Sequence, residues 1–292
     1  MLYIILTIVI SVLLLVIFKA FQKYDVNSLV AIVINYITAG LTGILFLNSD
    51  FNFAAIISSD WICICLPLGV LFISVFYLIS QTAQRISISS ASVANKMSVI
   101  MPVLFSVFLL HQTLSFLKVA GIVLAVLALY LSTYSPEKKK VSRNLFWLPV
   151  LVFIGSGLID IAINFTNTFY IHTKYESALF SISTFLSAFV IGIVVLLYLI
   201  FIKRSLPAKE VLAPKNILAG LILGIPNYFS IFFIFKSLDA RVLQSAQLFP
   251  VLNLSNVALA ALLGWLIYKE KLSTVNIAGI VLAIISILLI SL

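Results

Sequence analysis

Two charged side chains lie inside long apolar stretches of the sequence. Lys96 follows a run of small residues that starts at Ser90, and Asp160 lies between Ile159 and Ile161. A charge at the centre of a membrane helix costs about 2.5–3.5 kcal/mol, so such a residue normally faces a cavity or a partner. An ammonium group there can bind an anion, and a carboxyl group can carry a proton. Alternatively, Lys96 extends toward the nearer interface and Asp160 is an ordinary residue near a helix end.

Lys96 and Asp160 also form a candidate pair. The helical rise of 1.5 Å per residue places them about 9 Å apart in depth, a gap that extended side chains or a bridging ligand could close. We therefore take both residues as candidates for coupling to a proton or ion, and Lys96 as a candidate ligand-binding residue.

Amide and tyrosine side chains interrupt the apolar runs at further positions. In a helix bundle such groups often join helices through hydrogen bonds worth roughly 0.6 kcal/mol each, and they can equally line a cavity for a polar molecule. The additional candidates for substrate binding are Asn35, Tyr36, Tyr77, Gln81, Asn95, Asn227, Tyr228, Gln244 and Gln247.

The sequence lacks the residues that metal binding, intramembrane catalysis and ATP hydrolysis need. His111 and His172 lie near the ends of apolar runs without a His-Glu-x-x-His motif, and Asp160 has no acidic neighbour in sequence. Cys63 and Cys65 are one residue apart on a helix and point about 200° from each other. No Gly-x-x-x-x-Gly-Lys-Ser/Thr loop is present. We therefore expect no metal, no cofactor and no ATP-driven pumping, and an intramembrane enzyme is the least favoured class.

The composition describes a membrane protein. Of 292 residues, 63% are hydrophobic and 9% are charged, and the mean hydropathy is +1.24. A soluble domain carries about 25% charged residues, so a cytosolic enzyme, a secreted disulfide scaffold and a disordered chain are excluded. The net charge of +9 is scattered between apolar runs, whereas a nucleic-acid-binding protein gathers its cations on one face. No nucleic-acid partner is expected.

The apolar runs predict an all-α polytopic protein with ten transmembrane helices. Each of the three tryptophans lies near the end of a run, where an aromatic belt is expected, and the first run is expected to be a retained span rather than a signal peptide. The predicted spans are 2–18, 28–47, 61–80, 87–110, 116–134, 145–166, 177–202, 214–235, 242–267 and 275–292.

The loop charges predict the orientation of these spans. With ten spans both termini lie on one side. Loops on the opposite side hold thirteen Lys and Arg residues, and loops on the terminal side hold four. Positive loops stay in the cytoplasm, so both termini are expected to be extracytoplasmic unless one span is miscounted.

The two halves of the chain resemble each other. The sequence Ala-Gly-Ile-Val-Leu-Ala occurs at 120–125 and again at 278–283, and the segment 69–85 matches 224–241 with a one-residue gap. The predicted domains are a first five-helix repeat at 1–134, a basic linker at 135–144 and a second five-helix repeat at 145–292. Because five is odd, the second repeat must cross the membrane in the opposite sense, as in secondary transporters with a midplane site between repeats.

The chain resembles the EamA-like permeases of the drug/metabolite transporter superfamily. The resemblance rests on two five-span halves, each with a short polar turn (His111-Gln-Thr-Leu-Ser and Lys269-Glu-Lys-Leu-Ser) before an Ala-Gly-containing last helix. Gln112 stands where the family usually has Glu, and Glu270 keeps that residue in the second half. Family members are usually drawn with cytoplasmic termini, which disagrees with the loop charges.

These observations predict a secondary active transporter of the bacterial inner membrane. The buried cation favours an anionic or zwitterionic metabolite such as an amino acid, and the resemblance implies export. A lipid flippase or passive channel of the same architecture is the alternative. A homodimer is left open.

Overall fold

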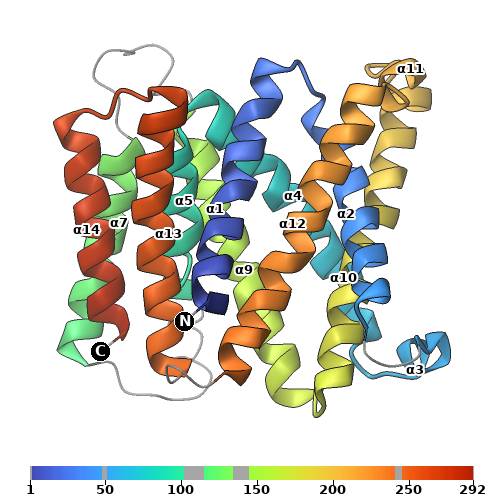
Figure 1. Cartoon of the computed structure of the whole chain (residues 1–292), viewed down its shortest axis with the longest axis horizontal. Coiled ribbons are helices and arrows are strands. Elements are labelled where there is room, and N and C mark those ends of the chain that lie inside the picture. Colours follow the sequence, from blue (N-terminus) through green and yellow to red (C-terminus); the bar gives the residue numbers. More distant parts are fainter. Residues whose placement is uncertain (1, 48–50, 102–114, 134–144, 241–244, 292) are drawn as a thin grey trace. The chain divides into compact units, whose positions relative to one another are not determined.

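The structure is a computed structural model that describes residues 2–47, 51–101, 115–133, 145–240 and 245–291, and these residues contain helices and no strands (Figure 1). The helices are α1 (Leu2–Lys23), α2 (Ser28–Leu45), α3 (Phe53–Ile57), α4 (Ile62–Arg85), α5 (Ile88–Met97), α7 (Phe116–Thr133), α9 (Trp147–Phe169), α10 (Lys174–Leu197), the π-helical turn η1 (Tyr198–Ile202), α11 (Ala208–Val211), α12 (Pro214–Asp239), α13 (Ser245–Tyr268) and α14 (Thr274–Ser291).

Seven of the described helices are long and apolar enough to cross a membrane: α1, α2, α4, α9, α10 with η1, α12 and α13. Two shorter apolar helices correspond to α7 and α14. The span predicted at 87–110 begins with α5, and its later residues lie outside the described part of the chain. The chain is therefore a multi-pass, all-helical membrane protein, and ten spans remain a prediction.

Polar residues begin several of these helices. The Asn27 side chain accepts a hydrogen bond from Val30 N at the start of α2, and the Ser87 side chain does the same for Ser90 N at the start of α5. Thr173 and Glu176 form a reciprocal capping box at the start of α10. Each cap satisfies a backbone N–H that has no partner within its helix.

The chain divides into two compact units. Unit 1 comprises 1–20, 78–160 and 229–292, and unit 2 comprises 21–77 and 161–228. Each unit therefore contains residues from both sequence halves. The borders fall inside α1, α4, α9 and α12. α1 and α9 begin the two predicted repeats. α4 contains the segment 69–85, and α12 contains 224–239 of its match 224–241, so equivalent helices are divided in both predicted repeats.

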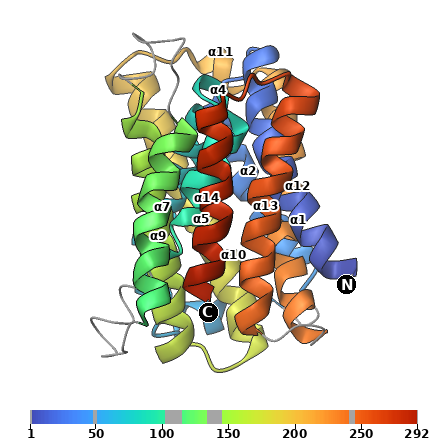
Figure 2. The same ribbon diagram turned by 90° about the vertical axis from the view of Figure 1, so that its left-hand side faces the viewer.

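The repeated Ala-Gly motif joins two helices of unit 1. A Cβ atom on Gly121 of α7 would lie 3.0 Å from the backbone nitrogen of Ile290, and one on Gly279 of α14 would overlap the backbone of Ser132. The two helices lie side by side in Figures 1 and 2. Each predicted repeat thus contributes one glycine to the close approach of α7 and α14.

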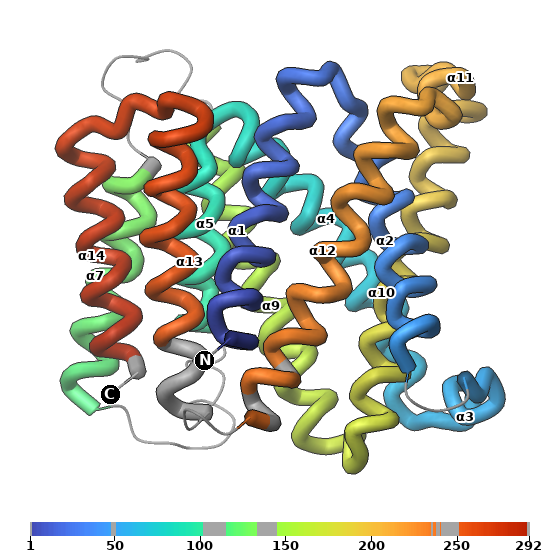
Figure 3. The backbone as a smooth tube through the Cα atoms, in the orientation of Figure 1, coloured from blue at the N-terminus to red at the C-terminus, as the bar shows by residue number. Residues whose placement is uncertain are grey.

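Glycines also set the packing of unit 2. A Cβ atom on Gly220 or Gly224 of α12 would lie 2.5 Å from the side chain of Ile34 or Thr38 on α2. Small residues permit close helix approach in membranes, so Gly220 and Gly224 allow α12 to pack closely on α2. Figure 3 traces the backbone of these helices.

Candidate functional site

The first polar cluster of the site lies in unit 1 and joins α5 to α9. Lys96 and Asn95 are half-buried near the end of α5, and Asp160 on α9 is exposed. Ser98 caps the end of α5, and its Oγ lies 3.0 Å from Asp160 Oδ2 and 2.6 Å from the carbonyl oxygen of Asn95. One hydroxyl proton can serve only one acceptor at a time, so Ser98 can release Asp160 without leaving its own donor unsatisfied.

Close packing brings Asp160 to Ser98. Gly157 lies one turn before Asp160 on α9, and a Cβ atom at Gly157 would overlap the Met101 side chain and lie 3.4 Å from the carbonyl oxygen of Ser98. Residues three apart share a helix face. The absence of a side chain at position 157 therefore allows α9 to approach the segment that carries Ser98.

Lys96 and Asp160 belong to the same polar cluster without direct pairing. Lys96 lies two residues before Ser98, which contacts Asp160, yet within the described residues no ion pair of 4.0 Å or less joins Lys96 to Asp160. The structure thus brings the two predicted coupling residues into one cluster and leaves the Lys96 ammonium without a direct carboxylate contact.

Ser156 adds a second hydroxyl to this face of α9. It lies one turn before Asp160, and its buried Oγ has no hydrogen-bond partner within the described part of the chain. Ser156 was not among the predicted site residues, because a serine in a membrane helix usually bonds to its own backbone and carries no distinctive signal.

The second polar cluster lies in unit 2. Asn227 Nδ2 on α12 donates to Asn35 Oδ1 on α2 at 3.1 Å, and both residues are buried. Asn35 Nδ2 lies 3.5 Å from the carbonyl oxygen of Ile32. Gly224 lies against the Asn35 backbone one turn before Asn227, so the same small face that packs α12 on α2 aligns the two amides.

The tyrosine candidates have different surroundings. Tyr36 is buried among Phe72, Phe76 and Phe185, and its hydroxyl donates to the carbonyl oxygen of Phe72 at 2.8 Å. Tyr228 is half-buried with its ring 6.1 Å from that of Phe46.

Of the four remaining candidates, two differ in their exposure and two have side chains outside the described part of the structure. Tyr77 on α4 is 37% exposed, and Gln81, one turn later, is buried. Gln244 lies outside the described residues, and for Gln247 only its place in the first turn of α13 is described. The roles of all these residues as substrate ligands remain predictions.

Both polar clusters join residues from opposite sequence repeats. Lys96 and Ser98 come from the predicted first repeat and Asp160 from the second, just as Asn35 comes from the first and Asn227 from the second. Each cluster lies within a single unit. Tyr77, Asp160 and Tyr228 are each the last residue before a unit border.

A third cluster, centred on Glu270, was not predicted. The Glu270 carboxylate accepts the backbone N–H of Ile88, the first residue of α5, at 3.0 Å and lies 3.4 Å from Lys19 Nζ at the end of α1. Lys19 also donates to the carbonyl oxygen of Gln84. The family resemblance, in which Glu270 keeps the usual glutamate, was the available signal, and its counterpart Gln112 lies outside the described residues.

No metal centre is formed by the described residues, which contain no group of three His, Cys, Asp or Glu side chains able to hold an ion. Cys65 is buried and Cys63 is exposed, both as free thiols.

Comparisons with known proteins agree with the architecture. A protein from Haemophilus influenzae, described as uncharacterized, is 28% identical over 282 residues, covering 94% of this chain and 92% of the relative. A solved crystal structure superposes with a TM-score of 0.53 at 15% identity, covering 98% of both chains, and shows similarity of fold.

The family model for the EamA-like transporter family matches residues 1–134 and 166–292. These two matches cover most of the chain in two halves. The chain therefore belongs to the EamA-like transporter family, within the drug/metabolite transporter superfamily.

Proposed function

We propose that this protein is a secondary active transporter that exports a small zwitterionic or anionic metabolite, such as an amino acid, across the bacterial inner membrane by alternating access. The observation that carries the proposal is the cluster of Lys96, Ser98 and Asp160. A site of midplane residues between inverted repeats is the arrangement expected of such carriers.

The charges of the cluster favour a zwitterion. The Lys96 ammonium can hold a substrate carboxylate, and the Asp160 carboxylate can hold a substrate ammonium group, as charge-assisted hydrogen bonds require. The lack of a direct ion pair between the two side chains leaves both groups with capacity for a ligand. Asp160 is also the candidate for carrying a coupling proton.

The positions of Lys96 and Asp160 in opposite predicted repeats support alternating access. Lys96 and Asp160 belong to opposite repeats, so a substrate that contacts both holds elements of the two repeats together. A ligand can shift a conformational equilibrium only through such differential contacts.

Counterflow by the purified protein in proteoliposomes tests this proposal. The panel contains amino acids, organic acids and nucleotides at pH 6 and pH 8. We expect saturable exchange of an amino acid or related compound, loss of at least tenfold in exchange rate for Lys96→Met, and loss of the pH dependence for Asp160→Asn.

Lys209→Gln is the matched control, because Lys209 is an exposed cation on the short helix α11. Its exchange rate should equal that of the wild type. Equal rates for Lys96→Met and Lys209→Gln would exclude the role of Lys96. Flux that does not saturate and shows no counterflow would instead identify a channel, and lipid scrambling without solute exchange would identify a flippase.

A further inference from the structure

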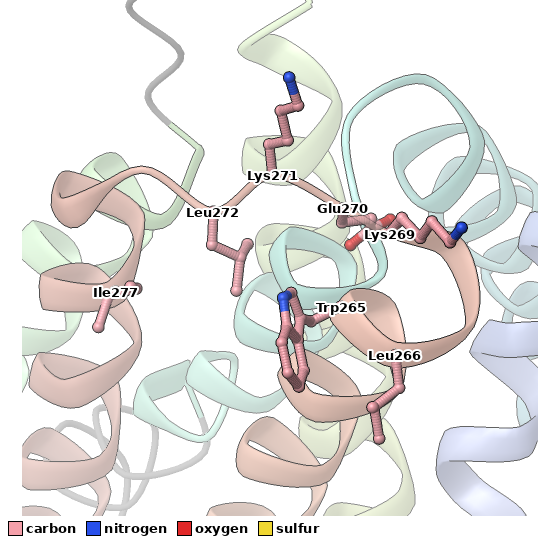
Figure 4. A pocket seen from close by; sticks show the side chains of 7 residues that line it. All are labelled: Trp265, Leu266, Lys269, Glu270, Lys271, Leu272 and Ile277. Carbon is pink, nitrogen blue, oxygen red and sulfur yellow. The ribbon is translucent and has the colours of Figure 1, made fainter.

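A groove lies beside the turn between α13 and α14. It has a volume of about 770 Å³ and is lined by Trp265, Leu266, Lys269, Glu270, Lys271, Leu272 and Ile277 (Figure 4). All of these residues belong to unit 1. The groove is separate from the cluster of Lys96 and Asp160.

The exposed side chains in the wall of the groove are of the types found at the boundary between the headgroups and the acyl chains of a bilayer. Trp265, Leu266 and Ile277 are 58%, 55% and 49% exposed, and Trp265 lies in the last turn of α13 with the nitrogen of its indole toward the turn (Figure 4). Tryptophan prefers the headgroup level of a bilayer, because its apolar ring can face the acyl chains while its N–H group forms a hydrogen bond with water or a headgroup. The two aliphatic side chains provide the adjoining surface for an acyl chain.

The rim of the groove is positively charged. Lys269 and Lys271 are exposed, and their side chains extend in different directions from the turn. Glu270 lies between them in sequence, but its side chain is only 9% exposed and its carboxylate is bound by Ile88 N–H and Lys19. The one acidic residue of the turn is therefore directed inward, and the two cations remain available to an external anion.

The location of the turn matches the leaflet that contains anionic lipid. Lys19 and Glu270 place the turn beside the end of α1 and the α4–α5 junction. The loop charges predict that this end is cytoplasmic. The cytoplasmic leaflet is negatively charged and attracts basic residues close to membrane helices.

We propose that the groove between the ends of α13 and α14 is a binding site for an anionic phospholipid. Lys269 and Lys271 provide the positive charge that attracts the headgroup phosphate, the Trp265 indole lies at the glycerol level, and one acyl chain packs on Leu266 and Ile277. The site is independent of the transported substrate.

Native mass spectrometry of the full-length protein tests the site. The protein in detergent is mixed with phosphatidylglycerol or phosphatidylcholine, and retained lipid is counted. We expect phosphatidylglycerol to be retained preferentially and its retention to fall at least fivefold in the double variant Lys269→Gln/Lys271→Gln. Trp265→Ala should lower the retention of phosphatidylglycerol as well.

The matched control is Lys203→Gln/Lys209→Gln, which removes two exposed cations from the α10–α12 connection, on the same predicted side of the membrane. This control should retain phosphatidylglycerol as the wild type does. Equal losses in the two double variants would overturn the site in favour of general charge attraction. Displacement of the lipid by millimolar inorganic phosphate would also overturn it, because the groove would then recognise a free anion.

Discussion

Glu270 illustrates how one buried carboxylate can link three helices. Burial raises the pKa of Glu270 from its ordinary value of 4.5, against the opposing effects of Ile88 N–H and Lys19. A carboxyl at the first turn of a helix is otherwise favoured, because it satisfies free N–H groups and meets the positive end of the helix dipole. Burial is the larger effect here.

The raised pKa predicts a pH-dependent stability. A carboxyl group with a higher pKa in the folded state than in the unfolded state contributes its full stabilisation below pH 4.5 and loses it as the pH rises through the folded-state pKa. We expect the melting temperature of the wild type to fall relative to that of Glu270→Gln between pH 4 and pH 7, measured in detergent by scanning fluorimetry.

Asp25 provides the control, because the hydrogen bond and charge of Lys215 lower its pKa. Any contribution of Asp25 to the pH dependence of stability should have the opposite sign, with stability lost on acidification. This contribution should be small because the group is exposed. A constant difference between wild type and Glu270→Gln over the whole pH range would contradict the prediction for Glu270.

Gly264 makes room for the Glu270 carboxylate. A Cβ atom at Gly264 would lie 2.5 Å from Glu270 Oε2 and 3.2 Å from its Cδ. Gly264→Ala should therefore displace the carboxylate from Ile88 N–H and destabilise the protein by about 1–3 kcal/mol, the cost of leaving a buried polar group unsatisfied.

The measurement is the denaturation midpoint of Gly264→Ala in the wild type and in a Glu270→Ala background. The cost of the alanine should be smaller in the second background, since the clashing carboxylate is absent. The same cost in both backgrounds would show that Gly264 acts through helix packing instead.

At the level of elements, the approach of α9 to the end of α5 controls the geometry of the proposed site. Gly157→Ala would place a Cβ atom 2.5 Å from Met101 Cβ, an atom near the backbone that cannot move far. We expect α9 to shift and the Ser98–Asp160 contact to lengthen. Transport should then show a severalfold higher KM, measured by counterflow.

Leu158→Ala is the comparison for this prediction, because Leu158 is the next residue on α9 and is 42% exposed. It should leave KM unchanged. If Gly157→Ala transports with wild-type kinetics, the α9–α5 approach is not needed for the site.

The α2–α12 contact gives a test that separates packing from ligand binding. Asn35 and Asn227 form a buried amide pair, so Asn35→Ala and Asn227→Ala should each destabilise the protein, and a double-mutant cycle should give a coupling of about 0.6 kcal/mol, with about 1.7 as the upper end for membrane hydrogen bonds. Refolding from denaturant measures the coupling energy. A coupling near zero accompanied by altered substrate affinity would assign the pair to the substrate.

Some residues of the candidate site could be predicted from the sequence because the free energy of placing a charge in a membrane helix does not depend on tertiary structure. Lys96 and Asp160 carry this unfavourable free energy however their helices pack, so their apolar neighbours in sequence are enough to identify them. The Asn35–Asn227 pair depends on which helices meet, and amides are common in membrane helices. Lys19 and Glu270 lie at span ends, where charges cost little, so their pairing left no compositional signal.

For the whole molecule, hydropathy predicted the membrane class and the positions of the long helices, because each membrane helix must satisfy its backbone internally over a fixed thickness. The division into two units was not predicted. The repeats suggest domains that follow the chain, whereas each unit combines residues from both halves, because the α7–α14 and α2–α12 contacts join one half to the other.

The loop charges predict how the molecule is oriented in the membrane. Thirteen cations in loops on the side opposite the termini, against four on the terminal side, predict extracytoplasmic termini. A C-terminal alkaline phosphatase fusion should be active and a C-terminal green fluorescent protein fusion should be dark. Changing Lys203, Arg204 and Lys209 to Gln removes three exposed cations and should weaken this preference, giving a mixed population in the same assay. A fluorescent C-terminal fusion of the wild type would place the termini in the cytoplasm and move the α13–α14 turn to the outer leaflet.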